Sequence, residues 1–143
     1  MDTATGGTAL GTRLPTLIAF VIGVGASYSA LYLSGLIFLW VLVAQGVPPE
    51  QTYARAYEST PYLIYAHTLG FVTTSVGGYW AARLSPNQAL RVTVKAGLLA
   101  SAFAFAQLSL PYDLPIPWWS QLASIAIPLP AFIAGMTWQR HRA

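Results

Sequence analysis

Charged side chains are missing from most of this chain, and their absence constrains the fold more than any motif. Seven basic and four acidic residues leave charge-free windows at residues 14–49, 59–82, 96–112 and 114–139. A helix needs about twenty apolar residues to cross a bilayer core roughly 30 Å thick, where every backbone hydrogen bond must be closed. The sequence therefore predicts an all-α fold, a single domain over residues 1–143 that forms a four-transmembrane-helix bundle. The helices are expected at about residues 15–45, 61–82, 87–110 and 117–138.

The composition supports the same interpretation. Charged residues make up 8% of the chain, against about 25% in soluble domains. A soluble chain with so few charges would have little surface to present to water. The chain has no cysteine, which excludes disulfides, thiolate metal ligands and thiol catalysis.

The basic residues predict the orientation of the bundle. Six of the seven fall on one side of the expected helices, and cytoplasmic flanks collect Lys and Arg, so both termini are expected in the cytoplasm. The bias of arginine over lysine, with many alanines and glycines, indicates a GC-rich bacterial genome. With its apolar spans, the chain is therefore expected in a bacterial inner (plasma) membrane. Three of the basic residues are expected to contact lipid headgroups: Arg83, Arg91 and Lys95.

The connections between helices carry recognisable signals. Residues 47–61 are expected to contain a short interfacial helix, and Thr60 with Pro61 is a plausible start for the next helix. Residues 85–88 resemble a capping box. Pro128 and Pro130 interrupt the last helix, which indicates a structural kink in preference to the broken helix of a transporter substrate site.

Small residues recur at helical spacing along each predicted helix. Such stripes let the backbones of membrane helices approach one another, so they are expected to face the interior of the bundle. The stripes are Gly23, Ser27, Ala30 and Ser34; His67, Gly70, Thr74, Gly77 and Ala81; Gly97, Ala100, Ala104 and Gln107; and Gln121, Ser124, Pro128, Ala131 and Gly135.

Three polar side chains lie at matching depths below the outer ends of their helices. They are His67, Gln107 and Gln121, and a polar group within a membrane span needs a partner. The three are therefore expected to converge. The favoured interpretation is interhelical hydrogen bonding that holds the bundle together. The alternative is a ligand site, where His67 would bind a quinone-like carbonyl, a lipid headgroup or a proton.

The sequence gives no support for catalysis, for a metal or for another cofactor. His141 lies in the tail, so one intramembrane histidine is left without a second imidazole, a carboxylate or a thiolate, which does not make a metal site. No carboxylate lies inside a predicted span. No catalytic residue is predicted, enzyme activity has no support, and no nucleic-acid partner is expected.

Residues 77–86, together with Pro115-Ile-Pro-Trp-Trp119 before the last helix, resemble small uncharacterised four-helix inner-membrane proteins of bacteria. This resemblance implies no activity. Two function classes stay open. The first is an accessory or interaction subunit, whose partners are membrane lipids and another membrane protein or a second copy of itself. The second is a lipid- or small-molecule-binding or transport protein with a polar pocket near the outer leaflet.

Overall fold

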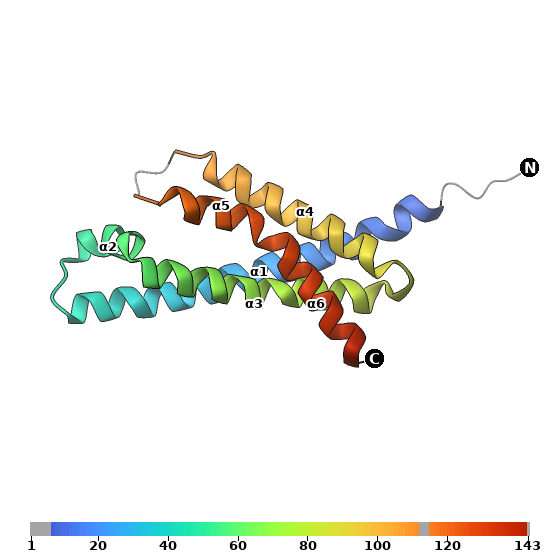
Figure 1. Cartoon of the computed structure of the whole chain (residues 1–143), viewed down its shortest axis with the longest axis horizontal. Helices are drawn as coiled ribbons and strands as arrows, with labels where there is room; N and C mark the ends of the chain where they lie inside the picture. The colour runs from blue at the N-terminus through green and yellow to red at the C-terminus, as the bar shows by residue number, and fades with distance from the viewer. Residues whose placement is uncertain (1–6, 112–114, 143) are drawn as a thin grey trace, which may run out of the picture.

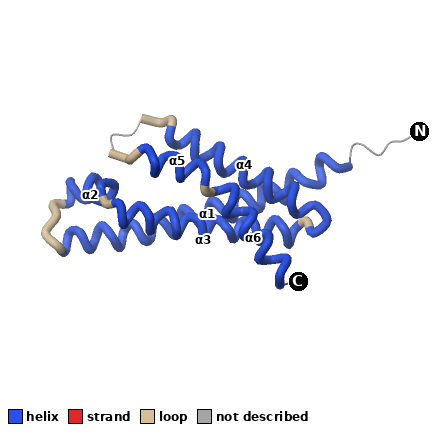
Figure 2. Tube along the Cα trace, in the orientation of Figure 1, coloured by secondary structure: helices blue, strands red, loops and turns tan. Residues whose placement is uncertain are grey.

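The computed structural model describes residues 7–111 and 115–142, and in these residues the chain is helical throughout apart from short connections (Figure 2). This confirms the predicted all-α fold. The elements in chain order are α1 (Gly7–Ala44), η1 (Pro49–Gln51), α2 (Thr52–Glu58), α3 (Thr60–Leu84), η2 (Pro86–Gln88), α4 (Ala89–Leu108), α5 (Trp118–Ala126) and α6 (Pro128–Arg142).

Three stretches are long and apolar enough to cross a membrane, which fits the predicted membrane protein. They are Gly11–Ala44, Pro86–Leu108 and Trp118–Arg142. Helix α3 has 25 residues but carries a histidine, several hydroxyl residues and glycines, which lower its hydropathy. It packs most extensively against α1 and α6. Because α3 is not among the three stretches that are apolar enough to cross a membrane, the predicted count of four spans stays a prediction.

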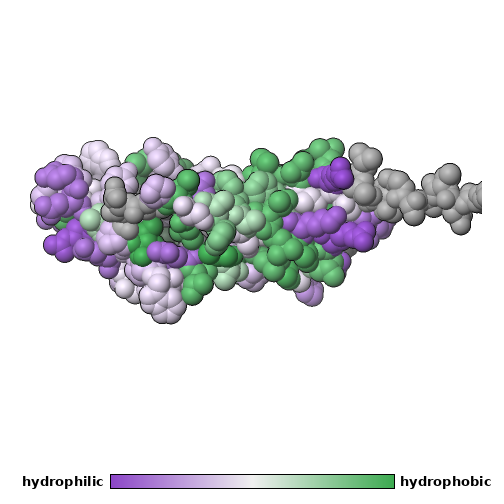
Figure 3. All heavy atoms as spheres, turned by 90° about the horizontal axis from the view of Figure 1, so that it is seen from above, coloured by the Kyte–Doolittle hydropathy of each residue, from purple (hydrophilic) through white to green (hydrophobic). Residues whose placement is uncertain are grey.

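The molecule is elongated, with two distinct ends (Figure 1). The start of α1, the connection between α3 and α4, and the end of α6 lie at one end, which we call the basic end. It carries Arg13, Arg83, Arg91, Lys95, Arg140 and Arg142. Helix α2, the end of α4 and the start of α5 lie toward the opposite end, the α2 end. Figure 3 shows hydrophilic residues near both ends of the visible face and apolar residues between them.

The helix starts differ in detail from the prediction. Ser59 caps α3, because its hydroxyl accepts a hydrogen bond from the Tyr62 amide at 3.4 Å, so Thr60 is already helical. The predicted capping box at residues 85–88 is wrong. Ser85 makes no side-chain capping bond, and Pro86–Gln88 form the single 3₁₀ turn η2 before α4.

The core lies toward the basic end and is organised around Phe132, whose side chain is fully buried. A β-carbon on Gly77 would lie 2.6 Å from Cε1 of Phe132, and one on Gly23 would lie 2.7 Å from its Cζ. A β-carbon on Gly78 would collide with the Phe132 carbonyl, and one on Gly135 with the Ser75 carbonyl. The small-residue stripes therefore face the bundle here, as predicted, because the backbones touch where side chains are absent.

The last predicted helix is divided at Ile127. The Ile127 amide still bonds to the Ala123 carbonyl at 2.9 Å, but Pro128 has no amide hydrogen and cannot continue the ladder. A new ladder of helical hydrogen bonds starts with α6, in which the Ala131 amide bonds to the Ile127 carbonyl at 3.1 Å. The kink predicted from the prolines is confirmed, and it lets α5 take its own direction away from the Phe132 core.

The basic end also holds the residues expected at lipid headgroups. Arg83 and Arg91 are exposed, and the Arg83 guanidinium lies 5.5 Å from the ring centroid of Trp80. Lys95 is exposed as well, and its ammonium donates a hydrogen bond to the Thr12 hydroxyl at 3.1 Å. Lys95 therefore links α4 to α1, and headgroup contact by the three residues stays a prediction.

Candidate functional site

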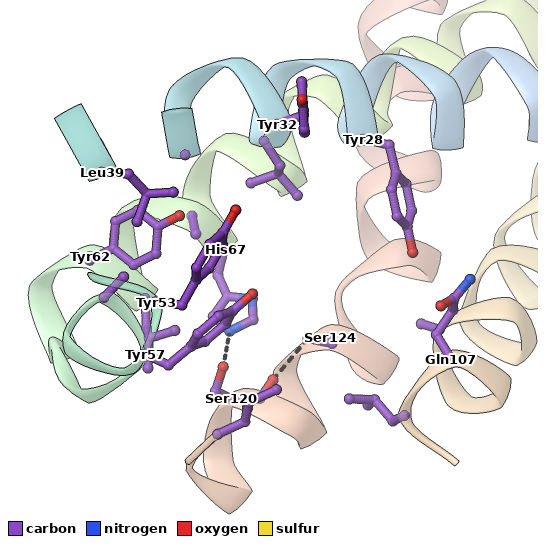
Figure 4. A pocket seen from close by; sticks show the side chains of 18 of the residues that line it. Tyr28, Tyr32, Leu39, Tyr53, Tyr57, Tyr62, His67, Gln107, Ser120 and Ser124 are labelled. Atoms are coloured by element: carbon purple, nitrogen blue, oxygen red, sulfur yellow. Dashed lines mark hydrogen bonds between the residues drawn. The ribbon is translucent and has the colours of Figure 1, made fainter. Parts of the chain in front are cut away.

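A cavity of about 430 Å³ opens between α1, α2, α3, α4 and α5, toward the α2 end (Figure 4). We call it the tyrosine cavity. Apolar side chains form most of its wall, and small residues such as Ala66 and Ala104 leave the space. Its polar groups are Tyr28, Tyr32, Tyr53, Tyr57, Tyr62, His67, Gln107, Ser120 and Ser124.

The course of α5 explains why the space exists. At the basic end, glycine contacts bring the helices together around Phe132. Beyond the break at Pro128, α5 packs mainly against α4 and touches α3 only sparsely. Because α5 does not continue the axis of α6, the helices separate toward the α2 end, and the small side chains there leave a cavity.

His67 holds α5 to α3. Its Nε2 atom lies 2.8 Å from the Ser120 hydroxyl, in a hydrogen bond whose direction depends on the tautomer. The His67 ring also meets the Trp119 ring edge-on, with centroids 5.9 Å apart. Ser120 is 3% exposed, and the Ser124 hydroxyl donates to its carbonyl at 3.0 Å. A buried hydroxyl and a partly buried imidazole thus satisfy each other inside the wall of the cavity.

The tyrosines come from three helices. In α2, Tyr53 and Tyr57 are four residues apart and therefore share a face, and both line the cavity. Tyr62 of α3 stacks on Phe38 of α1, with ring centroids 4.3 Å apart and planes 22° apart. Figure 4 places Tyr57 beside His67, and Tyr28 across the cavity on the side of Gln107. Hydrogen-bonding groups therefore stand on two opposite walls.

The structure brings two of the three predicted site residues together. His67 and Gln107 line the same cavity. Gln121 is exposed and does not line the cavity, although its amide donates to the carbonyl of Ile116, which does, at 3.0 Å. The hydrogen bond of His67 expected with a glutamine is made with Ser120 instead.

Sequence reasoning missed most of the tyrosines. Tyr28 and Tyr32 are four residues apart in α1 and line the cavity, so their spacing was an available signal. The short helix at residues 52–58 was correctly expected, but as an interfacial element. In the structure it forms a wall of the cavity.

A smaller pocket of about 160 Å³ continues the cavity toward the core. It shares His67, Tyr28 and Ala104 with the tyrosine cavity and reaches Thr74 and Pro128. His67 also forms part of an outer groove of about 330 Å³ between α3 and α5. One imidazole thus borders all three spaces.

The chemistry of the site is that of uncharged hydrogen bonding. Among the described residues that line the tyrosine cavity, none carries a fixed charge. Phenol and serine hydroxyls both donate and accept, and a neutral imidazole does the same through its two nitrogens. Within residues 7–111 and 115–142, no three His, Asp or Glu side chains gather closely enough to hold a metal ion. The site is suited to bind and orient a molecule.

Comparison with known protein families, with curated proteins and with solved structures finds no match to this chain.

Proposed function

We propose that this chain is a four-span protein of the bacterial inner membrane that binds a small, uncharged amphiphile in the tyrosine cavity. The observation that carries the proposal is the concentration of uncharged hydrogen-bonding side chains around a space of about 430 Å³. Polar groups inside a membrane span are costly and mark functional sites by default. Ligand pockets have this composition, a mostly apolar wall with a few convergent polar groups.

The distribution of charge supports a topology for this protein. The two ends of the described chain, at Gly7 and Arg142, share one end of the molecule with six basic residues. Cytoplasmic flanks collect such residues. With α3 as the fourth span, the tyrosine cavity then belongs to the outer leaflet. Arg83 and Arg91 would meet the headgroups of the inner leaflet.

The lining also narrows the class of ligand. A charged headgroup would lose its hydration without gaining an opposite charge, which is expensive in a medium of low dielectric constant. A neutral, flat ring gains offset contacts with the aromatic rings around it. Acceptors on the ring receive hydrogen bonds from tyrosine hydroxyls and from His67. An amphiphile of the quinone type meets these conditions.

Two variants of α4 test the proposal. Ala104 lines both the tyrosine cavity and the inner pocket, whereas Ala102 is exposed on the same helix. Ala104→Phe fills the space, and Ala102→Phe adds the same ring outside it. Each protein is extracted from native membrane in a mild detergent, and organic extracts are analysed by mass spectrometry. We expect a neutral lipid-soluble molecule that is enriched in wild type and in Ala102→Phe, and depleted in Ala104→Phe.

The accessory-subunit function rests on a different observation. Helix α1 presents exposed apolar surface along its length, with Val21 63% and Ile37 66% exposed. Lipid covers such a face in a monomer, and another membrane helix covers it in a complex. A stoichiometric protein partner in the same extracts, with no small molecule that distinguishes Ala104→Phe from Ala102→Phe, would favour this function over ligand binding.

A further inference from the structure

The wall between the tyrosine cavity and the outer groove is one side chain thick. His67 lines both spaces, and its ring fills the gap between α3 and α5 through its contacts with Ser120 and Trp119. Few other contacts join the two helices. An imidazole has two rotatable side-chain bonds, so a modest change of rotamer connects the cavity to the groove.

The outer groove is apolar and lies on the lateral surface of the bundle. Its lining comprises Ile64, Thr68 and Phe71 of α3, with Trp119, Ala123 and Ile127 from the region of α5, in addition to His67. Ile64 is 56% exposed. The Thr68 hydroxyl already donates to the Ile64 carbonyl at 2.8 Å. The groove therefore offers a hydrocarbon-like channel beside a cavity that carries the hydrogen-bonding groups.

The break before α6 makes the boundary adjustable. Helix α5 ends at Ala126. Pro128 interrupts the backbone hydrogen-bond ladder just after it, because proline has no amide hydrogen. Helix α6 is fixed independently, because Phe132 and Gly135 are locked in the glycine core. A tilt of α5 about Ile127 would open the gap beside His67 while the contacts of Phe132 and Gly135 stay in place.

We propose that the ligand carries a single hydrocarbon chain, that its ring lies in the tyrosine cavity, and that its chain passes His67 to lie in the groove between α3 and α5. This inference rests on the proposed function and adds to it the chain and its path. The position of His67, which lines both spaces and alone is shared by them, carries it. A chain on this path stays in contact with lipid, so the ligand enters sideways from the bilayer.

Two probes with the same ring separate the head from the chain. Ubiquinone-0 has the ring and no chain, and decylubiquinone adds a ten-carbon alkyl chain. Binding of each is measured on the full chain in nanodiscs of one fixed lipid composition. Ala123→Trp fills the groove from α5, and Ala126→Trp, at an exposed position of the same helix, is its matched control. Comparison between variants cancels the partitioning of decylubiquinone into the lipid.

We expect Ala123→Trp to weaken decylubiquinone binding at least about tenfold, the change produced by roughly 1.4 kcal/mol of steric cost. Ubiquinone-0 binding should stay as in wild type, which also shows that the variant is folded. Ala126→Trp should bind both probes normally. Thr68→Trp fills the groove from the opposite helix and should repeat the selective loss, with the exposed Val72→Trp as its control.

Equal binding of decylubiquinone by wild type, Ala123→Trp and Thr68→Trp would overturn the chain path and leave the cavity proposal intact. If only one of Ala123→Trp and Thr68→Trp loses binding of both probes, that variant has a folding defect. The result for the other variant then tests the chain path. If wild type bound neither ubiquinone-0 nor decylubiquinone, the proposed function would be overturned, and the chain path with it.

Discussion

The ring of Phe132 lies so close to Gly77 that a β-carbon at position 77 would come within 2.6 Å of its Cε1 atom. The same tip of the ring approaches Gly23, where a β-carbon would lie 2.7 Å from Cζ. The ring is thus enclosed between α1 and α3 and has no room to move aside. This contact fixes α6 against α1 and α3, and it thereby fixes the position of the break at Pro128, where α6 begins.

Gly77→Ala should lower the stability of the protein. The added methyl would meet the Phe132 ring and also the Ala19 carbonyl at 2.8 Å, and overpacking of this kind costs about 1–3 kcal/mol. Gly25→Ala is the control, since a β-carbon at position 25 would meet no neighbouring side chain or helix within 4 Å. The measurement is thermal unfolding in detergent. If the two variants melted together, the glycine contact would not hold the bundle as described.

His67→Gln should separate the structural role of His67 from its role toward a ligand. An amide can still bond to the Ser120 hydroxyl, and an interhelical hydrogen bond in a membrane contributes on average about 0.6 kcal/mol. The melting temperature should therefore change little. Ubiquinone-0 binding should fall, because the imidazole that borders the cavity is gone. Unchanged binding in His67→Gln would assign His67 to structure alone.

The topology is open to a direct test because the chain has no cysteine of its own. Gln51 and Asn87 are both exposed, at the α2 end and the basic end respectively. A membrane-impermeant maleimide should label Gln51→Cys in intact cells and Asn87→Cys only after lysis, because basic flanks stay in the cytoplasm. Labelling of both positions from the same side would exclude the four-span arrangement.

Replacing Pro128 and Pro130 together by alanine should straighten the last span. Alanine restores the amide donors that the prolines lack, so α5 and α6 can join into one helix. Spin labels at Leu122 and Arg140, on the exposed surfaces of α5 and α6, should move toward the backbone separation of about 27 Å expected for eighteen residues of straight helix. Ligand binding should weaken as α5 changes direction. Pro15→Ala, inside α1, is the control and should leave both measurements unchanged.

The helix faces near the core were predicted correctly from the sequence. Beyond the break the prediction was correct for Ser124, which lines the cavity, but not for Gln121. Gly70, Thr74, Gly77 and Ala81 are all buried, because an uninterrupted helix keeps the periodicity on which the stripe was drawn. The stripe of the last helix was extended through Pro128 as if the helix were continuous. Ser120 and Gln121 flank the line of the stripe on either side, and it is Ser120 that is buried and Gln121 that is exposed.

The tyrosines were missed for a related reason. Tyr53, Tyr57 and Tyr62 lie near helix ends, where aromatic residues are expected at the lipid headgroups. The spacing of Tyr28 and Tyr32 places them on one face of α1, but it does not show that a cavity lies beside that face. Tyr28, Tyr32 and Tyr57 line a common space only because α5 diverges and α2 folds back toward α3. Both depend on contacts between distant parts of the chain, which no single helix pattern encodes.

The division of the last span at Ile127 has a consequence for biosynthesis. Helix α5 has 9 residues and α6 has 15, lengths of about 14 and 22 Å, so neither alone reaches across a bilayer core of about 30 Å. In the proposed topology the two helices therefore enter the bilayer as a single bent segment. When the nascent chain has emerged only as far as Ile127, the apolar segment of α5 is too short to insert across the bilayer. The last span, which carries the α5 wall of the cavity, therefore inserts only after α6 has been translated.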